Sequence, residues 1–344
     1  MAATIAGKGH WLSGLRGHVA KIAPGFLVAA VVAAAARFLS EHYGAPAMLM
    51  ALLLGIAFHF LAEEGRCVPG IELTAKTVLR IGVALLGARI SIELLVGLGP
   101  ELIALVVLGV VCTIGFGLAG ARLLGRGWRL GLLTGGSVAI CGASAAMAIA
   151  AILPRNEHSE RNLIFTVLSV TVLSTIAMIV YPIVTQTFGL DQRATGVFLG
   201  GTIHDVAQVV GAGFSVSNET GETATLVKLI RVTMLAPVVL IFSLAIRAWG
   251  EAPADDAKRP PLVPAFVLAF LAFAGLNSVG FIPETVVDML ADTSRWALLI
   301  SIAAVGMKTS LRRILDVGGQ AIALIVAETI FIGGLILIGI SYLA

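Results

Sequence analysis

Apolar residues run through this sequence in long blocks, and short polar or glycine- and proline-rich segments separate the blocks. A helix needs about 20 predominantly apolar residues to cross the hydrocarbon core of a bilayer. Segments such as "AEEGRCVPG", "LPRNEHSE" and "EAPADDAKRPP" are typical of connections. The pattern predicts eleven transmembrane helices, at residues 22–39, 46–62, 73–90, 101–124, 131–152, 162–188, 194–216, 223–249, 262–280, 295–311 and 319–343.

The composition agrees with this pattern. Hydrophobic residues make up 58% of the chain and charged residues 12%, with a mean hydropathy of +1.00. Soluble domains carry about a quarter charged residues, so this chain has too few to cover a soluble surface. We therefore expect an all-α polytopic membrane protein embedded in a lipid bilayer. The net charge of +3 gives no indication of nucleic-acid binding, and the odd number of cysteines, without paired spacing, suggests neither disulfides nor a metal site.

Lys and Arg residues in alternate connections predict the orientation. With the N-terminus inside, the outer connections hold three cations, at Arg155, Arg161 and Arg295. Residues 1–21 lack the pattern of a removable signal peptide, so we expect a cytoplasmic N-terminal segment and a C-terminus outside. The inner segments hold thirteen cations, at Lys8, Arg16, Lys21, Arg66, Arg122, Arg126, Arg129, Arg193, Arg247, Lys258, Arg259, Arg312 and Arg313.

Several charged residues fall within or beside the predicted spans. An intramembrane charge costs at least about 2.5–3.5 kcal/mol on insertion scales and therefore needs a partner or a function. The acids, Asp205 and Glu328, are fewer than the cations, so the excess of positive charge favours a bound anion. Two alternatives stay open: a ladder of charges on one helix face at Glu72, Lys76 and Arg80, and a pairing of Glu328 with any of the cations. The cations are Lys76, Arg80, Arg89, Lys228, Arg231 and Lys308.

Two predicted spans contain polar and glycine-rich interruptions, "GGSVAICGASA" in the fifth and "GMKTS" in the tenth. Each interrupted span is the fourth in a set of five, and the odd number of crossings inverts the second set. Interrupted spans in corresponding positions are typical of transporter binding sites. We therefore predict one transmembrane domain, residues 22–344, with an extra helix at 22–39 and inverted five-helix repeats at 46–188 and 194–343. Discontinuous crossing helices would be spans 5 and 10. The third span, "LLGARIS", also resembles "AVGMKTS" in the tenth, and that pairing stays open.

The candidate site residues follow from these interruptions and charges. His204 is a candidate proton carrier because its ordinary pKa lies near physiological pH, and Asp205 and Gln208 are candidate coupling residues beside it. His204 and Gln208, at i and i+4, would share a helix face. Alternatively, Asp205 caps or bridges helices and His204 is a hydrogen-bonded core residue. Arg80, Arg89 and Glu328 are secondary candidates. The candidate substrate-binding residues are Ser137, Cys141, Gly142, Ser144, Lys228, Arg231, Lys308, Thr309 and Ser310.

Six blocks of the sequence resemble, in order, the bacterial YeiH family of proposed sulfate exporters. These blocks are "LRIGVALLGARIS", "GGSVAICGASAAMA", "GGTIHDVAQVVGAG", "ATLVKLIRVTMLAPVV", "NSVGFIP" and "AVGMKTSLRRIL", within a likeness from about residue 24 to the C-terminus. The family is similar to the group of sodium/proton antiporters and bile-acid sodium symporters. The resemblance implies an alternating-access carrier in the bacterial cytoplasmic membrane, without a cofactor, for a small inorganic or organic anion such as sulfate or a sulfonate. It also implies coupling to protons or sodium ions, and a homodimer.

Two other functions remain as alternatives. A serine protease within the membrane would pair Ser144 with His204, but Ala145 follows the serine where a glycine is expected, and a dyad leaves the buried cations unexplained. A passive anion channel would use the same charges. No phosphate-binding Gly-x-x-x-x-Gly-Lys loop occurs, so ATP-driven pumping by this chain is not expected. The sequence favours a transporter over an enzyme.

Overall fold

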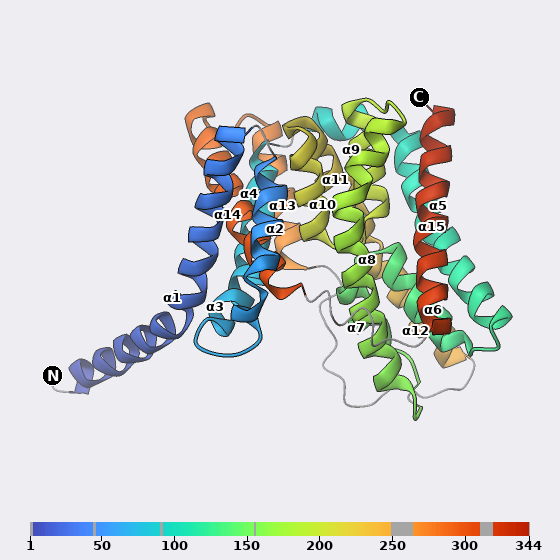
Figure 1. The fold of residues 1–344 in the computed structure, drawn as a ribbon, viewed down its shortest axis with the longest axis horizontal. Helices are drawn as coiled ribbons and strands as arrows, with labels where there is room; N and C mark the ends of the chain where they lie inside the picture. Colours follow the sequence, from blue (N-terminus) through green and yellow to red (C-terminus); the bar gives the residue numbers. More distant parts are fainter. Residues whose placement is uncertain are drawn as a thin grey trace. The chain divides into compact units, whose positions relative to one another are not determined.

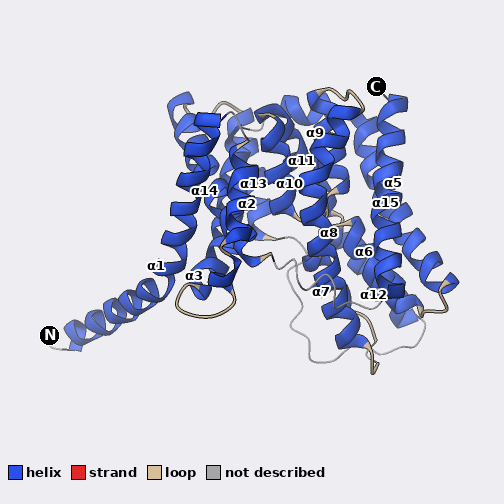
Figure 2. Ribbon diagram, in the orientation of Figure 1, coloured by secondary structure: helices blue, strands red, loops and turns tan. Residues whose placement is uncertain are grey.

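A computed structural model describes residues 3–43, 46–89, 92–154, 156–248, 264–309 and 319–343. All regular structure in these residues is helical (Figure 2). Six of the described helical segments are long and apolar enough to cross a membrane, which confirms a polytopic α-helical membrane protein. They are Val19–Tyr43, Val96–Leu123, Ser159–Thr187, Asn218–Ala248, Glu284–Lys308 and Ile322–Leu343.

The chain divides into two compact units. The first comprises Met1–Gly82 and Asp292–Ser310, and the second comprises Val83–Ala291 and Leu311–Ala344. The first unit therefore combines the N-terminal helices with part of the predicted second repeat. It contains α1 (Ala3–Tyr43), α2 (Ala47–Ala57), η1 (His59–Ala62), α3 (Val68–Leu73), the π-helical turn η2 (Thr74–Val78), the start of α4 (Leu79–Leu86) and the end of α14 (Glu284–Lys308).

Glycines allow close helix contacts in the first unit. Gly25 of α1 lies against the backbone of Gly70 in α3, and Gly55 of α2 lies against Gly306 in α14. A Cβ atom at Gly306 would lie 3.0 Å from the Gly55 Cα. Helices that cannot rely on the hydrophobic effect within a bilayer associate through such small-residue contacts.

The second unit holds most of the chain. Its first long helix, α5, bends at Gly99, which has a φ of 73° and directly precedes Pro100. A proline inside a helix lacks the N–H for the helical hydrogen bond, which accounts for the bend. This unit contains the end of α4, the 3₁₀ turn η3 (Gly87–Arg89) and the start of α14. Its other helices are α5 (Ile92–Leu123), α6 (Trp128–Ala139), α7 (Ala143–Ala150), α8 (Ser159–Thr187), α9 (Gln192–Thr202), α10 (Val206–Val216), α11 (Asn218–Thr233), α12 (Leu235–Ala248), α13 (Ala265–Ser278) and α15 (Gly319–Leu343).

Helices α6 and α7 form a hairpin, which we call the first hairpin. The chain breaks between them at Gly142, whose φ of 63° is a conformation that favours glycine. The Ile149 side chain of α7 lies against Gly136 of α6, so α7 returns alongside α6. The 12 residues of α6 span about 18 Å, roughly half of a hydrocarbon core about 30 Å thick. Residues 131–152, predicted as a crossing helix, therefore enter and leave on the same side.

Helices α9 and α10 form the second hairpin. The Ser217 hydroxyl, just after α10, donates a hydrogen bond to Gln192 Oε1 at the start of α9, over 2.8 Å. This bond makes the end of α10 and the beginning of α9 neighbours, and Gly213 of α10 also lies against Gly221 near the start of α11. The predicted crossing at 194–216 is therefore also a hairpin. Hydropathy windows measure apolar length and do not distinguish a crossing from a return.

The hairpins enter from opposite sides, because α8 crosses between them. Figure 1 shows α9 and α10 in the upper part of this unit and α6 and α7 in the lower part. Two loop assignments made from the sequence are therefore wrong. Arg161, at the start of α8, lies on the side where α5 ends, with Arg122 and Arg126. Arg193 lies on the other side and donates a hydrogen bond to the Gly97 carbonyl near the start of α5.

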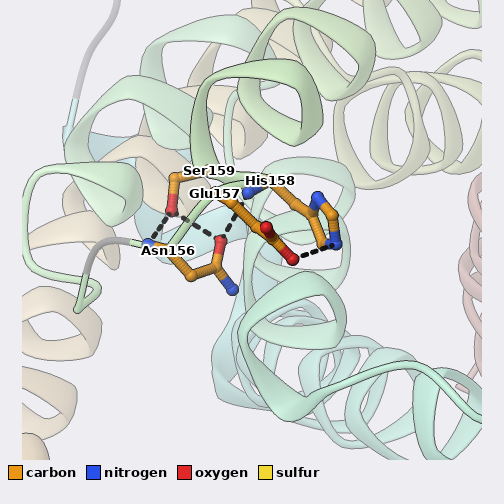
Figure 3. Close-up of polar contacts among 4 residues, drawn as sticks. All are labelled: Asn156, Glu157, His158 and Ser159. Carbon is orange, nitrogen blue, oxygen red and sulfur yellow. Dashed lines mark hydrogen bonds and ion pairs between the residues drawn. The ribbon is translucent and has the colours of Figure 1, made fainter.

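A polar turn connects the first hairpin to α8 (Figure 3). The Asn156 N–H donates to Ser159 Oγ over 2.8 Å, and Asn156 Oδ1 accepts from the His158 N–H and from the Ser159 hydroxyl, each over 3.0 Å. Glu157 Oε1 lies 3.3 Å from His158 Nε2. These exposed groups satisfy the backbone where a helix begins, as expected at the end of a hairpin that returns to the membrane surface.

Candidate functional site

The tips of the two hairpins meet inside the second unit. The tips are residues 140–142 and 203–205, where the helices are interrupted. A Cβ atom at Gly142 would lie 3.5 Å from His204 Cβ, which is van der Waals contact. The two half-length hairpins enter from opposite sides, so we expect this contact near the middle of the bilayer.

Lys228 binds both tips. Its side chain extends from α11 and is 0% exposed. Lys228 Nζ donates to the Ile140 carbonyl over 2.6 Å and to the Ile203 carbonyl over 3.0 Å. An ammonium group has three N–H donors, so one donor remains beyond these two bonds.

Arg231 lies one turn further along α11 and is also 0% exposed. Its guanidinium donates to four carbonyls at the ends of α6 and α9. These are Ala139 and Val138, each over 2.8 Å, and Gly200 and Ile203, each over 3.0 Å. The last carbonyls of a helix have no partner within the helix and carry a partial negative charge. Arg231 and Lys228 supply both the missing donors and the compensating charge.

The sequence did not predict the partners of Lys228 and Arg231. Their observed partners are main-chain carbonyls, and within the described part of the chain neither cation forms an ion pair with an acid. Carbonyl partners carry no sequence signature, because every residue has a carbonyl.

The second halves of the hairpins begin differently. Asp205 Oδ1 accepts a hydrogen bond from the Ala207 N–H over 2.8 Å and thereby caps α10. Ser174 of α8 accepts from the Asp205 N–H over 3.0 Å. Gly142, which precedes α7, provides no side-chain cap, and Ser144 in the first turn of α7 is exposed. The N-terminus of α7 is therefore open, whereas that of α10 is capped by a carboxylate.

His204 and Gln208 do not share a helix face as expected, because α10 begins only at Val206 and His204 lies in the break. His204 is 0% exposed, and its Nε2 lies 3.0 Å from Thr329 Oγ1 of α15. Gln208 Nε2 lies 3.5 Å from Thr175 Oγ1 of α8. The break turns the two side chains toward different helices.

The remaining polar candidates of the first hairpin have separate environments. Ser137 is buried and donates to the Leu133 carbonyl within α6. Cys141 is a buried free thiol at the tip. Ser144 and His204 are not joined by a hydrogen bond in the residues that the structure describes, so a nucleophile–base pair is not formed there.

Lys308 belongs to the first unit. Its Nζ lies 3.7 Å from Glu72 Oε1, and the Thr309 hydroxyl donates to the Val305 carbonyl over 3.0 Å. α14 is continuous from Glu284 to Lys308, and the end of the predicted tenth span, residues 310–311, lies outside the described residues. The discontinuous segments that the structure describes are the fifth and seventh predicted spans. Ser310 lies outside the described residues.

The secondary candidates also have defined positions. The Arg80 side chain is exposed in the first unit. In the second unit, Arg89 Nη2 lies 3.2 Å from Glu222 Oε1. Glu328 is 0% exposed, and its Oε1 lies 2.8 Å from Thr134 Oγ1 of α6. It does not pair with a cation in the described chain, so the expectation that it balances one of them is wrong.

Sequence reasoning missed three hydroxyl residues that support the site, Ser174, Thr134 and Thr329. Ser174 lies in α8 among several other Ser and Thr residues, whereas α6 and α15 each contain one other Ser residue. Most such hydroxyls donate to the carbonyl four residues earlier, so residue type alone does not identify the ones with tertiary partners.

Comparisons with known proteins give a consistent family. The family model described as "Conserved hypothetical protein 698" matches residues 24–325. The chain is 73% identical over 320 residues to the UPF0324 membrane protein RB0971 of Rhizobium meliloti (strain 1021), covering 93% of each chain. It is 68% identical over 329 residues to the UPF0324 membrane protein TauZ of Paracoccus pantotrophus, covering 95% of this chain and 97% of that protein. The chain therefore belongs to the UPF0324 family of membrane proteins, the YeiH family that its motifs resemble.

Proposed function

We propose that this protein is a secondary active transporter of a small anion, with sulfate or a related sulfur oxyanion or sulfonate as its substrate. The observation that carries the proposal is the meeting of two hairpin tips from opposite sides, bonded together by buried Lys228 and Arg231. Interrupted helices near the bilayer midplane are typical of transporter binding sites. A site between two such tips lies at a similar distance from both membrane surfaces.

The charges at the tips favour an anion. Lys228 and Arg231 contribute two positive charges and Asp205 one negative charge. The partial charges of the helix ends largely cancel, because each break joins a helix C-terminus, with about −0.5 elementary charge, to a helix N-terminus, with about +0.5. The remaining positive charge lies beside the open N-terminus of α7, whose N–H groups and Ser144 hydroxyl are donors. The oxygens of a sulfate-like group accept several hydrogen bonds at once.

The bonded tips also favour a rigid-body mechanism. Lys228 and Arg231 connect α11 to both hairpins, so moving one hairpin alone would break charge-assisted hydrogen bonds in an apolar environment. We infer that the hairpins and α11 move as one body during alternating access. The substrate contacts in this proposal are Gly142, Ser144 and Lys228, with Cys141 beside them.

The hairpins refine the predicted topology. Because two of the eleven apolar segments become hairpins, we propose nine crossings, with the N-terminus inside and the C-terminus outside. We infer that the inverted unit is a hairpin followed by a helix, namely α6–α7–α8 and α9–α10–α11. In the second unit, the side that we assign to the cytoplasm holds Arg122, Arg126, Arg129, Arg161 and Arg247, and the other side holds Arg89 and Arg193.

The experiment is transport by purified protein in proteoliposomes. Vesicles loaded with unlabelled sulfate, sulfite or an alkyl sulfonate are mixed with the same labelled anion, and counterflow is measured. The proposal predicts saturable counterflow for at least one anion. A Lys228→Met variant should lose this counterflow, and the control variant Arg247→Gln, at an exposed arginine, should retain it. Large non-saturating conductance in a planar bilayer would instead indicate a channel, and no flux of any of these anions would reject the proposal.

A further inference from the structure

Glu328 is a buried carboxyl group that the anion site does not use. It lies in α15, an otherwise apolar helix, and is 0% exposed. Gly117 of α5 leaves room for it, and Gly131 and Gly135 of α6 lie against Gly117. A Cβ atom at Gly117 would lie 2.6 Å from Glu328 Oε1 and 2.7 Å from the Gly131 carbonyl oxygen. The carboxyl therefore fills a small space created by glycines where three helices meet.

The hydrogen bonds around Glu328 fit a protonated acid. Thr134 Oγ1 lies 3.0 Å from the Leu130 carbonyl and 2.8 Å from Glu328 Oε1. A hydroxyl has one proton, and a carbonyl can only accept. When the Thr134 proton is on the Leu130 carbonyl, the bond to Glu328 requires a proton from the carboxyl; when Thr134 donates to Glu328 Oε1, no donor is left for Oε2. Glu328 Oε2 is buried without a partner in the described chain, which an ionised carboxylate would not tolerate.

No charge compensates Glu328 within the described residues. The titratable groups of the helices against α15 are Glu101, Cys112 and Arg122 on α5, Arg129 on α6, Glu160, Arg161 and Tyr181 on α8, and Arg193 on α9, and none forms an ion pair with Glu328. His204 faces α15 through Thr329, the residue next to Glu328. An ionised Glu328 would thus be an isolated charge at membrane depth.

Glu328 and its neighbour contact both hairpins. Glu328 bonds Thr134 in the first hairpin, and Thr329 bonds His204 at the tip of the second. A change in the charge of Glu328 would therefore alter how α15 holds the hairpins that form the anion site. Movement of the hairpins away from α15 would in turn open the carboxyl to water.

We infer that Glu328 carries the proton whose movement is coupled to anion transport, which rests on the function proposed above. In the conformation described here, the proton is bonded to a Glu328 carboxyl oxygen. When the hairpins shift, the O–H bond breaks, the proton passes to water and the carboxylate keeps the electron pair. Return of a proton from the other side restores this conformation, so one proton crosses in each cycle.

Infrared spectroscopy of the purified protein near neutral pH tests the protonation without any transport. We expect a carboxylic-acid C=O stretch in the wild type that is absent in E328Q and displaced in E328D. E101Q, at an exposed glutamate of α5, should leave the band unchanged. If the wild-type and E328Q spectra have no difference in this band, Glu328 is ionised and the inference is wrong.

Proteoliposomes then test the coupling. Folded E328Q should retain anion counterflow and lose the accumulation driven by a pH gradient, whereas E101Q should retain both. Gradient-driven accumulation by E328Q at the wild-type level would overturn the inference. Loss of counterflow in folded E328Q would also overturn it, because Glu328 would then have a role in anion binding. If E328Q does not fold, the E328D variant is tested instead. Retained counterflow with altered gradient-driven accumulation would support the inference, and unaltered gradient-driven accumulation would contradict it. A wild type that transports no tested anion would reject the proposed function while the infrared result still reports on the proton.

Discussion

The two hairpins end their first helices in the same way and begin their second helices differently. The last carbonyls of α6 and α9 are bound by the same two cations, Lys228 and Arg231. Beyond the breaks, α10 is capped by Asp205, whereas α7 follows Gly142 without a side-chain cap. The partial positive charge of α10 is therefore already met by a carboxylate of the chain, and that of α7 remains available to an external anion.

This difference suggests a division of roles within the site. The shared half, at the ends of α6 and α9, is structural because its polar groups are satisfied by α11. The other half, at the beginnings of α7 and α10, differs between the hairpins and determines anion binding and the charge of the site. The following predictions separate the two halves, from the largest expected effect to the smallest.

Replacement of Arg231 should have the largest effect. Arg231→Met leaves four buried carbonyls without their donor, and loss of one partner from a buried charged network costs about 3–5 kcal/mol. We expect poor yield or a strongly lowered melting temperature in detergent. The control is Arg247→Met at an exposed arginine. An unchanged melting temperature for Arg231→Met would show that the tips do not depend on this side chain.

Lys228→Met should be less severe. Two hydrogen bonds are lost, and hydrogen bonds to charged groups contribute about 1.5–3 kcal/mol each. The variant should fold with reduced stability, and its affinity for the anion should fall by at least about tenfold, since each 1.4 kcal/mol is a factor of ten. Isothermal titration measures the affinity. Wild-type affinity in the folded variant would remove Lys228 from the binding site.

Gly142→Ala tests the open tip. The added Cβ would lie 3.5 Å from His204 Cβ, an ordinary contact, so the penalty comes from the φ of 63°. With ψ at −124°, this conformation is sparsely populated and costs a non-glycine residue about 1–3 kcal/mol. We expect this loss of stability together with weaker anion binding. Gly115→Ala, where the space around the position is open, should cause neither change. Unaltered anion binding by Gly142→Ala would place the ligand elsewhere.

The smallest effects concern the capped tip. Asp205→Ala removes the cap of α10, which should lower stability by about 1 kcal/mol. Asp205→Asn retains a capping oxygen and removes the charge, so stability without anion should change little. The same variant should bind the anion more tightly, seen as a larger ligand-induced rise in melting temperature. A smaller rise than in the wild type would show that the Asp205 charge favours binding.

The sequence predicts much of this arrangement. Apolar length and low charge predict the helical membrane class, and the glycine-rich segment around Gly142 predicts a break that the structure contains. Burial of Lys228 and Arg231 also follows from their apolar surroundings. These features depend on local composition, which a single sequence records.

The direction of the chain after each break was not predicted. A returning hairpin and a crossing helix need the same apolar residues, and the contacts that distinguish them join distant positions, such as Gln192 with Ser217. The partners of the cations were missed because they are backbone atoms. The shared face expected for His204 and Gln208 assumed a continuous helix, and the break before Val206 removes it.

Labelling at Ser144 tests the central claim most directly, because this exposed residue lies in the first turn of the open helix α7. The variant Ser144→Cys, in a background without Cys67, Cys112 and Cys141, is labelled by a water-soluble thiol reagent with and without sulfate, sulfite or an alkyl sulfonate. Leu123→Cys, at an exposed end of α5, is the control. We predict that at least one anion slows labelling at position 144 and leaves position 123 unaffected. Equal labelling rates at position 144 with and without every anion would contradict an anion site at the meeting tips.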